Sequence, residues 1–491
     1  MIPAPETSTP TTSTPTTTCS PSSSAATLTV AAAALLWAGG VAPAAAQDTS
    51  GGADRDPELS SSVDEGFTIA VVGDIIIAHS LEHMVTDPEF EEVVRLLQDA
   101  DVATGNLETQ IIDGRHFHGT NGGGRHGAEP HSAEWMAEMG FDLLARPNNH
   151  ANDYGREGLN ETSEHLERAG IEHSGIGDTY WAARAGRFHT GERGRVGMVA
   201  PTAGNTLAAE PADGEWPGVG GLSTLRVTKY FVIPEEDWGA VEAIRENFPS
   251  GDGFYARGAN TDDHIRILGE EFLRGGPDVT EPHYTYEINQ RDLDDILASV
   301  REAKMRSDFI TVALHSHDFE EARGGYRGPG IPEALHIDTN PSVADYLPVV
   351  ARRSIDNGAD LFQGTGVHVL RGIEIYRNRP IFYGLGEFIR QRDIGGLAGR
   401  GDPTRDACDG CPFPVKYESV VAVSEYDGDR LEEVRLHPIE LRYDSERMAH
   451  RGIPRTAPPE VGRRILTRLQ ELSEPFGTSI VIEDGVGYIR P

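Results

Sequence analysis

Two short runs of the chain are almost entirely apolar and rich in β-branched residues, residues 67–73 (FTIAVVG) and residues 309–314 (FITVAL). Runs of this length and composition predict strands that are buried within a sheet. Helical patterns lie between these and other short strand-like segments, over residues 89–100, 132–139, 156–169, 291–305 and 342–357. Strands that alternate with helices in this way predict an α/β fold.

Two parts of the chain depart from this alternation. Residues 373–383 and 418–441 predict hairpins, which add an antiparallel part to the sheets. Residues 203–285 are rich in glycine, proline and acidic residues, with helical patches expected near 235–247 and 262–273. We expect this stretch to form an insertion or a lid over the α/β scaffold.

The first 46 residues differ in composition from the rest. Residues 5–24 are rich in Ser, Thr and Pro, and an apolar run over 25–41 precedes Ala44-Ala45-Ala46. This order resembles a secretory signal peptide with a small-residue cleavage site, although no Lys or Arg precedes the apolar run. We expect a leader over residues 1–46 that is cleaved near Ala46, followed by a linker over 47–65. The protein is then exported, periplasmic or extracellular; a retained leader that associates with the membrane is the alternative.

The formal net charge of −35 bears on the class of partner. Nucleic-acid binding and docking on anionic lipid both need a basic face, so neither is expected. Cys408 and Cys411 form a Cys-Asp-Gly-Cys segment without a second pair or a nearby His at zinc-knuckle spacing. For an exported protein, a local disulfide between them is favoured over free thiols.

Polar side chains follow the predicted strands at five places. They are Asp74, the segment Gly105-Asn106-Leu107-Glu108, the segment Asn148-Asn149-His150 with Asp153, the segment His315-Ser316-His317, and His368. Sites in α/β proteins form at the carboxyl ends of strands, so we expect these side chains to converge. Asp153 stands where the next helix would begin, so capping is its favoured role and catalysis is the alternative.

The residue types in these clusters suit one kind of ligand. Carboxylates, an amide oxygen and neutral imidazoles form a mixed nitrogen and oxygen donor set, which suits Mn²⁺, Zn²⁺ or Fe, with Mg²⁺ at the oxygen-rich end. We therefore predict a site for one or two divalent metal ions. A carboxylate that bridges two ions would let them activate water and stabilise a leaving group.

The order of the motifs resembles the CapA family of poly-γ-glutamate (capsule) synthesis proteins. The resemblance rests on the segments strand-Gly-Asp, Asn-Leu-Glu, Asn-Asn-His-x-x-Asp-x-Gly, Leu-His, Gly-x-x-x-His-Val and Tyr-x-Leu-Gly-x-Phe. CapA proteins in turn look like calcineurin-like metallophosphoesterases. The resemblance implies a metallo-dependent phosphatase-like domain over 66–445, a four-layer αββα sandwich of two mixed β-sheets flanked by helices. It leaves residues 446–491 as a C-terminal extension packed on that domain.

The resemblance also implies roles for individual residues. The metal-facing positions are those of Asp74, Glu108, Asn149, His315 and His368, and His150 with Asp153 beside it forms the catalytic acid or base. The implied function is a metal-dependent hydrolase or transferase of capsule biosynthesis. Its expected substrate is an anionic polymer or envelope glycopolymer, and membrane-bound capsule synthesis proteins are expected partners. A phosphoester hydrolase and a non-catalytic capsule assembly or export factor are the alternatives.

The sequence departs from the family pattern at several of these positions. Ile76 stands where phosphoesterases carry a histidine ligand, and His79 is a candidate substitute. Gly366 stands where one imidazole of a His-Pro-His segment is expected, and His317 is a candidate replacement. Glu387 replaces a neutral amide, which makes it a candidate contact for metal or substrate.

An anionic substrate would need a local basic groove in so acidic a chain. Arg371 and Arg323 lie near the motif segments, and arginine binds carboxylates through paired hydrogen bonds, so both are candidates for substrate binding. Exposed surface positions without a ligand are the alternative for both. The glycine-rich residues 119–127 lack the Lys of a phosphate-binding loop, so a flexible loop is favoured there.

Overall fold

The computed structural model describes residues 56–113, 126–204, 207–211, 213, 217–247, 261–321, 340–391, 415–442 and 445–491. All of them belong to one compact unit, Ala46–Pro491. The leader, most of the linker, Arg323, Cys408 and Cys411 lie outside the described residues. Within the described ranges, no helix combines the length and the apolar character that a membrane crossing requires.

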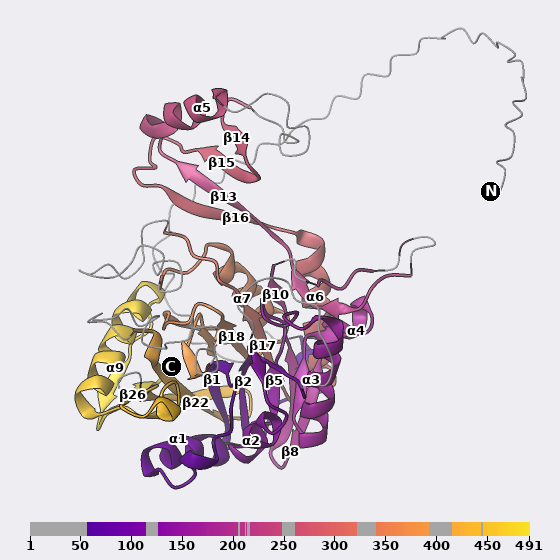
Figure 1. Ribbon diagram of the computed structural model, residues 1–491, viewed down its shortest axis with the longest axis vertical. Helices are drawn as coiled ribbons and strands as arrows, with labels where there is room; N and C mark the ends of the chain where they lie inside the picture. The colour runs from indigo at the N-terminus through magenta and orange to yellow at the C-terminus, as the bar shows by residue number, and fades with distance from the viewer. Residues whose placement is uncertain are drawn as a thin grey trace, which may run out of the picture. The chain divides into compact units, whose positions relative to one another are not determined.

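The chain folds as a mixed α/β protein, as the alternation predicted, and most of its strands form two large sheets (Figure 1). The first sheet runs in the order β25-β26-β23-β22-β1-β2-β5-β6, with β21 beside β1 and β24 beside β23. Its strands are β1 Phe67–Ile76, β2 Val102–Leu107, β5 Leu143–Ala145, β6 Glu172–Ser174, β21 Glu387–Arg390, β22 Glu418–Asp427, β23 Arg430–Glu440, β24 Arg455–Thr456, β25 Val481–Glu483 and β26 Val486–Ile489. Because β26 pairs with β23, the last residues of the chain complete this sheet.

The second sheet runs in the order β12-β10-β17-β18-β20-β19, with β9 beside β17 and β8 beside β9. Its strands are β8 Arg187–Gly191, β9 Gly194–Val199, β10 Thr202–Ala203, β12 Thr224–Leu225, β17 Phe309–His315, β18 Leu361–Thr365, β19 Ile373–Tyr376 and β20 Arg379–Phe382. Two short pairs join β3 Gln110–Ile111 to β4 Gly127–Ala128, and β7 Ile176–Gly177 to β11 Gly221–Leu222. The predicted hairpins over 373–383 and 418–441 are confirmed as β19–β20 and β22–β23.

The residues of β1 alternate between two hydrophobic cores, which is why the run is apolar throughout. Phe67, Ile69 and Val71 share a core with Met198 and Phe309 of the second sheet. The rings of Phe67 and Phe309 lie 5.4 Å apart. This core therefore contains residues of both sheets.

Helices pack against both sheets. Ala70 and Val72 of β1 pack with α1 (Pro88–Gln98) and α2 (Ser132–Glu138), and Val312 of β17 packs with α6 (Gln290–Lys304) and α7 (Tyr346–Asp356). Capping fixes where two of these helices begin. The side chain of Asp87 accepts hydrogen bonds from backbone N–H groups of α1, and the side chain of Asn289 accepts one from a backbone N–H group of α6. Further helices are α3 Gly155–Ala169, α4 Tyr180–Arg184, α5 Trp238–Glu246 and α9 Pro459–Ser473.

A separate small sheet, in the order β14-β15-β13-β16, lies largely within the predicted insertion, and β16 extends beyond it. Its strands are β13 Val227–Ile233, β14 His264–Ile267, β15 Glu270–Arg274 and β16 His283–Ile288. The helix expected near 262–273 is wrong, because β14 and β15 form a hairpin there. Leu268 and Gly269 both have positive φ at its turn, a conformation that a helix does not contain.

His173 on β6 gives the fold a dependence on pH that can be measured. The pKa of His173 is lowered to about 3, chiefly by burial and also by the nearby Arg146 and Arg187. The unfolded chain takes up this proton near pH 6.5 while the folded chain does not, so stability falls as the pH drops below 6.5. When the pH is lowered from 7 to 5, the free energy of unfolding measured in urea should fall by about 2 kcal/mol more for the wild type than for His173→Gln. His79→Gln, at an exposed position, should follow the wild type.

Candidate metal centre

Asp74 lies near the end of β1, between polar residues of both neighbouring strands. The register of β1 shifts between Val71 and Asp74, so that Asp74 is paired with Asn106 of β2 and with Glu387 of β21. Gly73 permits this arrangement, because a Cβ atom there would lie 1.8 Å from the carbonyl oxygen of Gly386. The carboxyl end of the first sheet therefore carries a row of three buried polar side chains.

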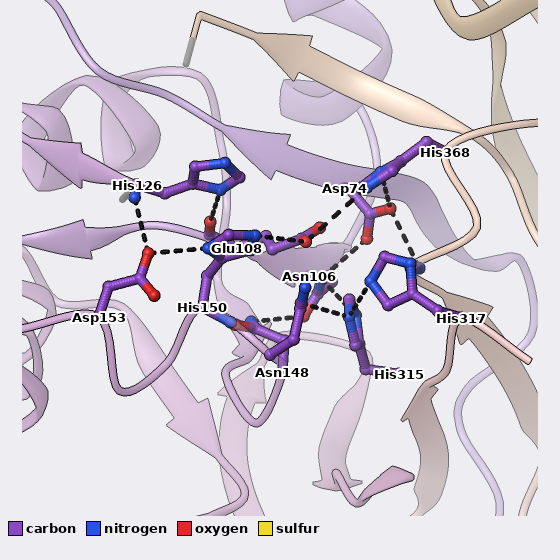
Figure 2. A network of polar contacts seen from close by, with 12 residues as sticks. Asp74, Asn106, Glu108, His126, Asn148, His150, Asp153, His315, His317 and His368 are labelled. Atoms are coloured by element: carbon purple, nitrogen blue, oxygen red, sulfur yellow. Dashed lines mark hydrogen bonds and ion pairs between the residues drawn. The ribbon is translucent and has the colours of Figure 1, made fainter. Parts of the chain in front are cut away.

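His315 brings the second sheet into contact with this row. It ends β17, and its Nδ1 lies 3.2 Å from Nδ2 of Asn106 and 3.2 Å from Oγ1 of Thr365. Its Nε2 lies 3.0 Å from Oδ1 of Asn149 and 3.3 Å from Nε2 of His317. Motifs that are far apart in the sequence thus meet where the carboxyl ends of β1, β2 and β17 come together (Figure 2).

His368 approaches the same carboxylates from the turn after β18. Its Nδ1 lies 3.3 Å from Oδ2 of Asp74 and 3.1 Å from Oε1 of Glu387. Its backbone has a φ of 59°, a strained conformation for a residue with a side chain. The backbone N–H of Gly366, in the same turn, donates to Oδ2 of Asp74 at 3.1 Å.

Glu108 is common to three groups of side chains whose ligand atoms lie within 4.8 Å of one another. The groups are Asp74, Glu108 and His315; Glu108, His317 and His368; and Glu108, His126 and His150. Glu108 and Asp74 are fully buried. Buried carboxylates surrounded by imidazoles match the donor set of a divalent transition metal, so these residues are able to hold such an ion.

His150 and Asp153 form a pair at the edge of this cluster. Nδ1 of His150 lies 2.8 Å from Oδ2 of Asp153, and its Nε2 lies 3.9 Å from Oε1 of Glu108. The backbone N–H of His126 donates to the same Asp153 oxygen, and the His126 ring stacks on that of His150 at 3.5 Å. Helix α3 begins at Gly155 with Tyr154 as its N-cap residue, so the favoured capping role of Asp153 is wrong.

The electrostatics of the cluster follow from its burial. The pKa of Asp74 is raised to about 7, chiefly by burial and also by the neighbouring Glu387 carboxylate, against the hydrogen bond from Asn106. Burial lowers the pKa of His315 well below its usual value, and His317 and His150 contribute to that fall. His315 is therefore neutral at physiological pH, the form in which an imidazole binds metal.

Some of the predicted site residues lie elsewhere. His79 is exposed and belongs to none of the three groups, so the described structure does not bring it into the cluster. Arg371 is buried, and its Nη2 donates to the backbone oxygen of Asp318 at 2.6 Å, so it is not an exposed contact for substrate. Glu387 lies inside the cluster, where it pairs with Arg390 as well as His368.

The sequence did not single out three residues of this network. Asn106 bonds both Asp74 and His315, and Nδ2 of Asn148 donates to Oδ1 of Asn106 at 3.2 Å. Asn106 and Asn148 both belonged to segments already marked, but nothing distinguished them from Glu108 and Asn149. His126 lies near the end of the glycine-rich residues 119–127. As an isolated histidine, it could not be distinguished from an ordinary loop residue.

Gly366 is required by the packing of His315. A Cβ atom at Gly366 would lie 2.9 Å from Cε1 of His315, and the φ of Gly366 is +102°. We expect Gly366→Ala to reduce the free energy of unfolding by about 1–3 kcal/mol in urea titrations. Gly204→Ala is the matched control, because Gly204 also has a positive φ but no atom lies within 4 Å of its Cβ position. Equal losses in the two variants would show that contact with His315 is not the cause.

The family model and the relatives found by comparison with known proteins point to the same family. The model of the family described as "Bacterial capsule synthesis protein PGA_cap" matches residues 68–323 and 335–392. An uncharacterized protein of Sinorhizobium fredii, y4sH, is 38% identical over 470 residues, which cover 89% of this chain and 96% of that protein.

The names of two Bacillus relatives describe a role. The PGA biosynthesis protein CapA of Bacillus subtilis is 23% identical over 388 residues, 75% of this chain and 79% of that protein. The capsule biosynthesis protein CapA of Bacillus anthracis is 23% identical over 333 residues, 66% of this chain and 60% of that protein. Since the family model covers more than half of its residues, the chain belongs to the bacterial capsule synthesis protein family, the CapA family.

Proposed function

We propose that this CapA-family protein is a metal-dependent hydrolase or transferase that acts on poly-γ-glutamate or a related anionic polymer of the cell envelope. The observation that carries the proposal is the buried Glu108, shared by three groups of carboxylates and imidazoles. The polymer class comes from the names of the Bacillus relatives, which are proteins of PGA and capsule biosynthesis.

The proposed fold is the four-layer αββα sandwich of metallophosphoesterases. Three hydrophobic cores support this proposal. One lies between helices α1 and α2 and the first sheet, one between the two sheets, and one between the second sheet and helices α6 and α7. In that arrangement the carboxyl ends of β1, β2 and β17 supply the site. Ile76 lacks the imidazole that phosphoesterases use at this position, which weighs against a plain phosphoester hydrolase.

Asp74, Glu108, Asn149, His315 and His368 are the proposed ligands, with His317 and Glu387 as further candidates. A divalent cation such as Mn²⁺, Zn²⁺, Fe²⁺ or Mg²⁺, when bound, would supply Lewis acidity to polarise the scissile bond and to activate water. His150 is the proposed acid or base. Asp153 accepts the hydrogen bond from its Nδ1, which leaves Nε2, on the side of Glu108, to carry the transferred proton.

The proposed setting follows the predicted leader. An exported protein would meet its polymer in the periplasm or outside the cell, where membrane-bound capsule synthesis proteins are the proposed partners. Arg371 is buried, so it is not proposed as an exposed contact for an anionic chain, and Arg323 lies outside the described residues.

Metal content and polymer cleavage, measured together, test this proposal. The mature wild type should carry at least one divalent transition ion and shorten poly-γ-glutamate, and Asp74→Asn should do neither. Asp142→Asn is the control, because Asp142 lies before β5, contacts Ala103 and His189, and belongs to none of the three groups around Glu108. Bound metal with turnover of p-nitrophenyl phosphate esters alone would favour the phosphoester alternative. Bound metal, no turnover, and normal capsule output from His150→Ala would favour a non-catalytic assembly or export factor.

A further inference from the structure

The segment that follows His317 is bound to the small sheet. The backbone N–H of Tyr284 in β16 donates to the carbonyl of Glu320 at 2.7 Å, and His283 forms an isolated bridge with Glu321. The ring of Tyr284 also packs edge-on against that of Phe319 at 5.2 Å. Residues 319–321 therefore continue the small sheet beyond β16, only two residues from a candidate metal ligand.

Tyrosine hydroxyls hold the two residues next to His317. The hydroxyl of Tyr286, on β16, accepts from the N–H of Phe319 at 3.3 Å and donates to its carbonyl at 3.0 Å. The hydroxyl of Tyr346 donates to Oδ2 of Asp318 at 2.8 Å. Because burial raises the pKa of both tyrosines, with Asp318 adding to the rise, both hydroxyls stay protonated and can donate.

Arg371 and Ser316 form further hydrogen bonds to the backbone of Asp318, next to His317. Nη2 of Arg371 donates to the carbonyl of Asp318, and Oγ of Ser316 accepts from the N–H of Asp318 at 3.0 Å. The N–H of Ser316 donates to the carbonyl of Thr365, at the end of β18. Hydrogen bonds from the second sheet and from the small sheet thus fix the backbone both before and after His317.

His317 is the side chain that this support orients. Its Nε2 lies 3.3 Å from Nε2 of His315, and its ring lies 5.2 Å from that of His368, with which it shares one of the groups around Glu108. Gly366 offers no imidazole, and a side chain there would crowd His315, so His317 remains the candidate replacement for the missing imidazole.

We propose that Tyr286 is a positioning residue through which the small sheet holds His317 in place as a metal ligand. The inference rests on the proposed metal centre and adds a role for the small sheet, whose strand β16 contacts residues 319–321. Residues that orient a metal ligand typically change metal affinity 10–100-fold when they are replaced. The predicted loss for Tyr286→Phe is therefore about tenfold or more.

Titration of cobalt(II) chloride into metal-stripped protein tests this inference, with affinity and the visible absorption of the bound ion as readouts. Tyr286→Phe should bind Co²⁺ about tenfold or more weakly than the wild type, with an altered spectrum. Tyr230→Phe is the matched control, because it removes a hydroxyl bonded to Glu287 from the opposite face of the same sheet. It should bind like the wild type.

A double variant makes the test specific to His317. If Tyr286 acts through His317, Tyr286→Phe combined with His317→Ala should bind no more weakly than His317→Ala alone. Wild-type affinity and spectrum in Tyr286→Phe would overturn the inference, and so would equal losses in Tyr286→Phe and Tyr230→Phe. Absence of Co²⁺ binding by the wild type would instead overturn the proposed metal centre, and this inference with it.

Discussion

Replacement of Asp74 by asparagine should stabilise the metal-stripped protein at pH 8 and abolish its stabilisation by added Mn²⁺. Asp74 is fully buried, and burial raises its pKa to about 7 from an ordinary value of 3.8. Because the pKa of Asp74 is higher in the folded than in the unfolded chain, its contribution to the free energy of unfolding is fully present only below about pH 4. That contribution is lost as the pH rises through 7. At pH 8 the ionised carboxylate costs up to about 4 kcal/mol, which the neutral amide avoids.

Urea unfolding with and without Mn²⁺ at pH 4 and pH 8 measures both effects. For the wild type, Mn²⁺ at a hundred times its dissociation constant should add about 2.7 kcal/mol, and for Asp74→Asn it should add nothing. The advantage of the stripped variant should largely disappear at pH 4, where Asp74 is protonated in the folded state and only partly ionised in the unfolded chain. Asp142→Asn should keep its response to Mn²⁺. Equal stabilisation of Asp74→Asn by Mn²⁺ would exclude Asp74 as a ligand.

Most of the large elements followed from local sequence patterns, and the exception has a physical cause. Helices α1, α3 and α6 and the buried strands β1 and β17 have strong periodic or continuous apolar signals that match their packing. Residues 262–273 carry apolar positions that suit either a helix or a strand, so the period alone did not decide. The turn at Leu268 and Gly269 and the pairing with β13 decided it, and that pairing is not local.

The candidate site was predictable where function requires an unusual residue at the end of a strand. Asp74, Glu108, His315 and His368 all lie within one cluster because the carboxyl ends of strands from both sheets meet there. Tyr286 and Arg371 could not be assigned in this way. Their partners are backbone groups of residues 318 and 319, and a residue that binds a backbone group leaves no complementary side chain in the sequence.

His150→Gln should lower turnover of the polymer about 10²–10⁴-fold while the bound metal is retained. The reason is its geometry: Nδ1 is held by Asp153, and Nε2 lies 3.9 Å from Glu108, next to the proposed ion. Glutamine keeps a polar group of similar reach but transfers no proton. Polymer cleavage and metal content, measured on the same preparations, separate loss of proton transfer from loss of the ion.

Two further variants interpret the result. Asp153→Asn should cause a smaller loss of turnover than His150→Gln, because it keeps the imidazole and removes only the carboxylate that orients Nδ1. His83→Gln, at an exposed histidine outside the three groups around Glu108, should leave both turnover and metal content unchanged. A fall in metal content in His150→Gln would contradict the proton-transfer role. It would make His150 a ligand together with His126 and Glu108, the third group whose atoms already lie within reach of one ion.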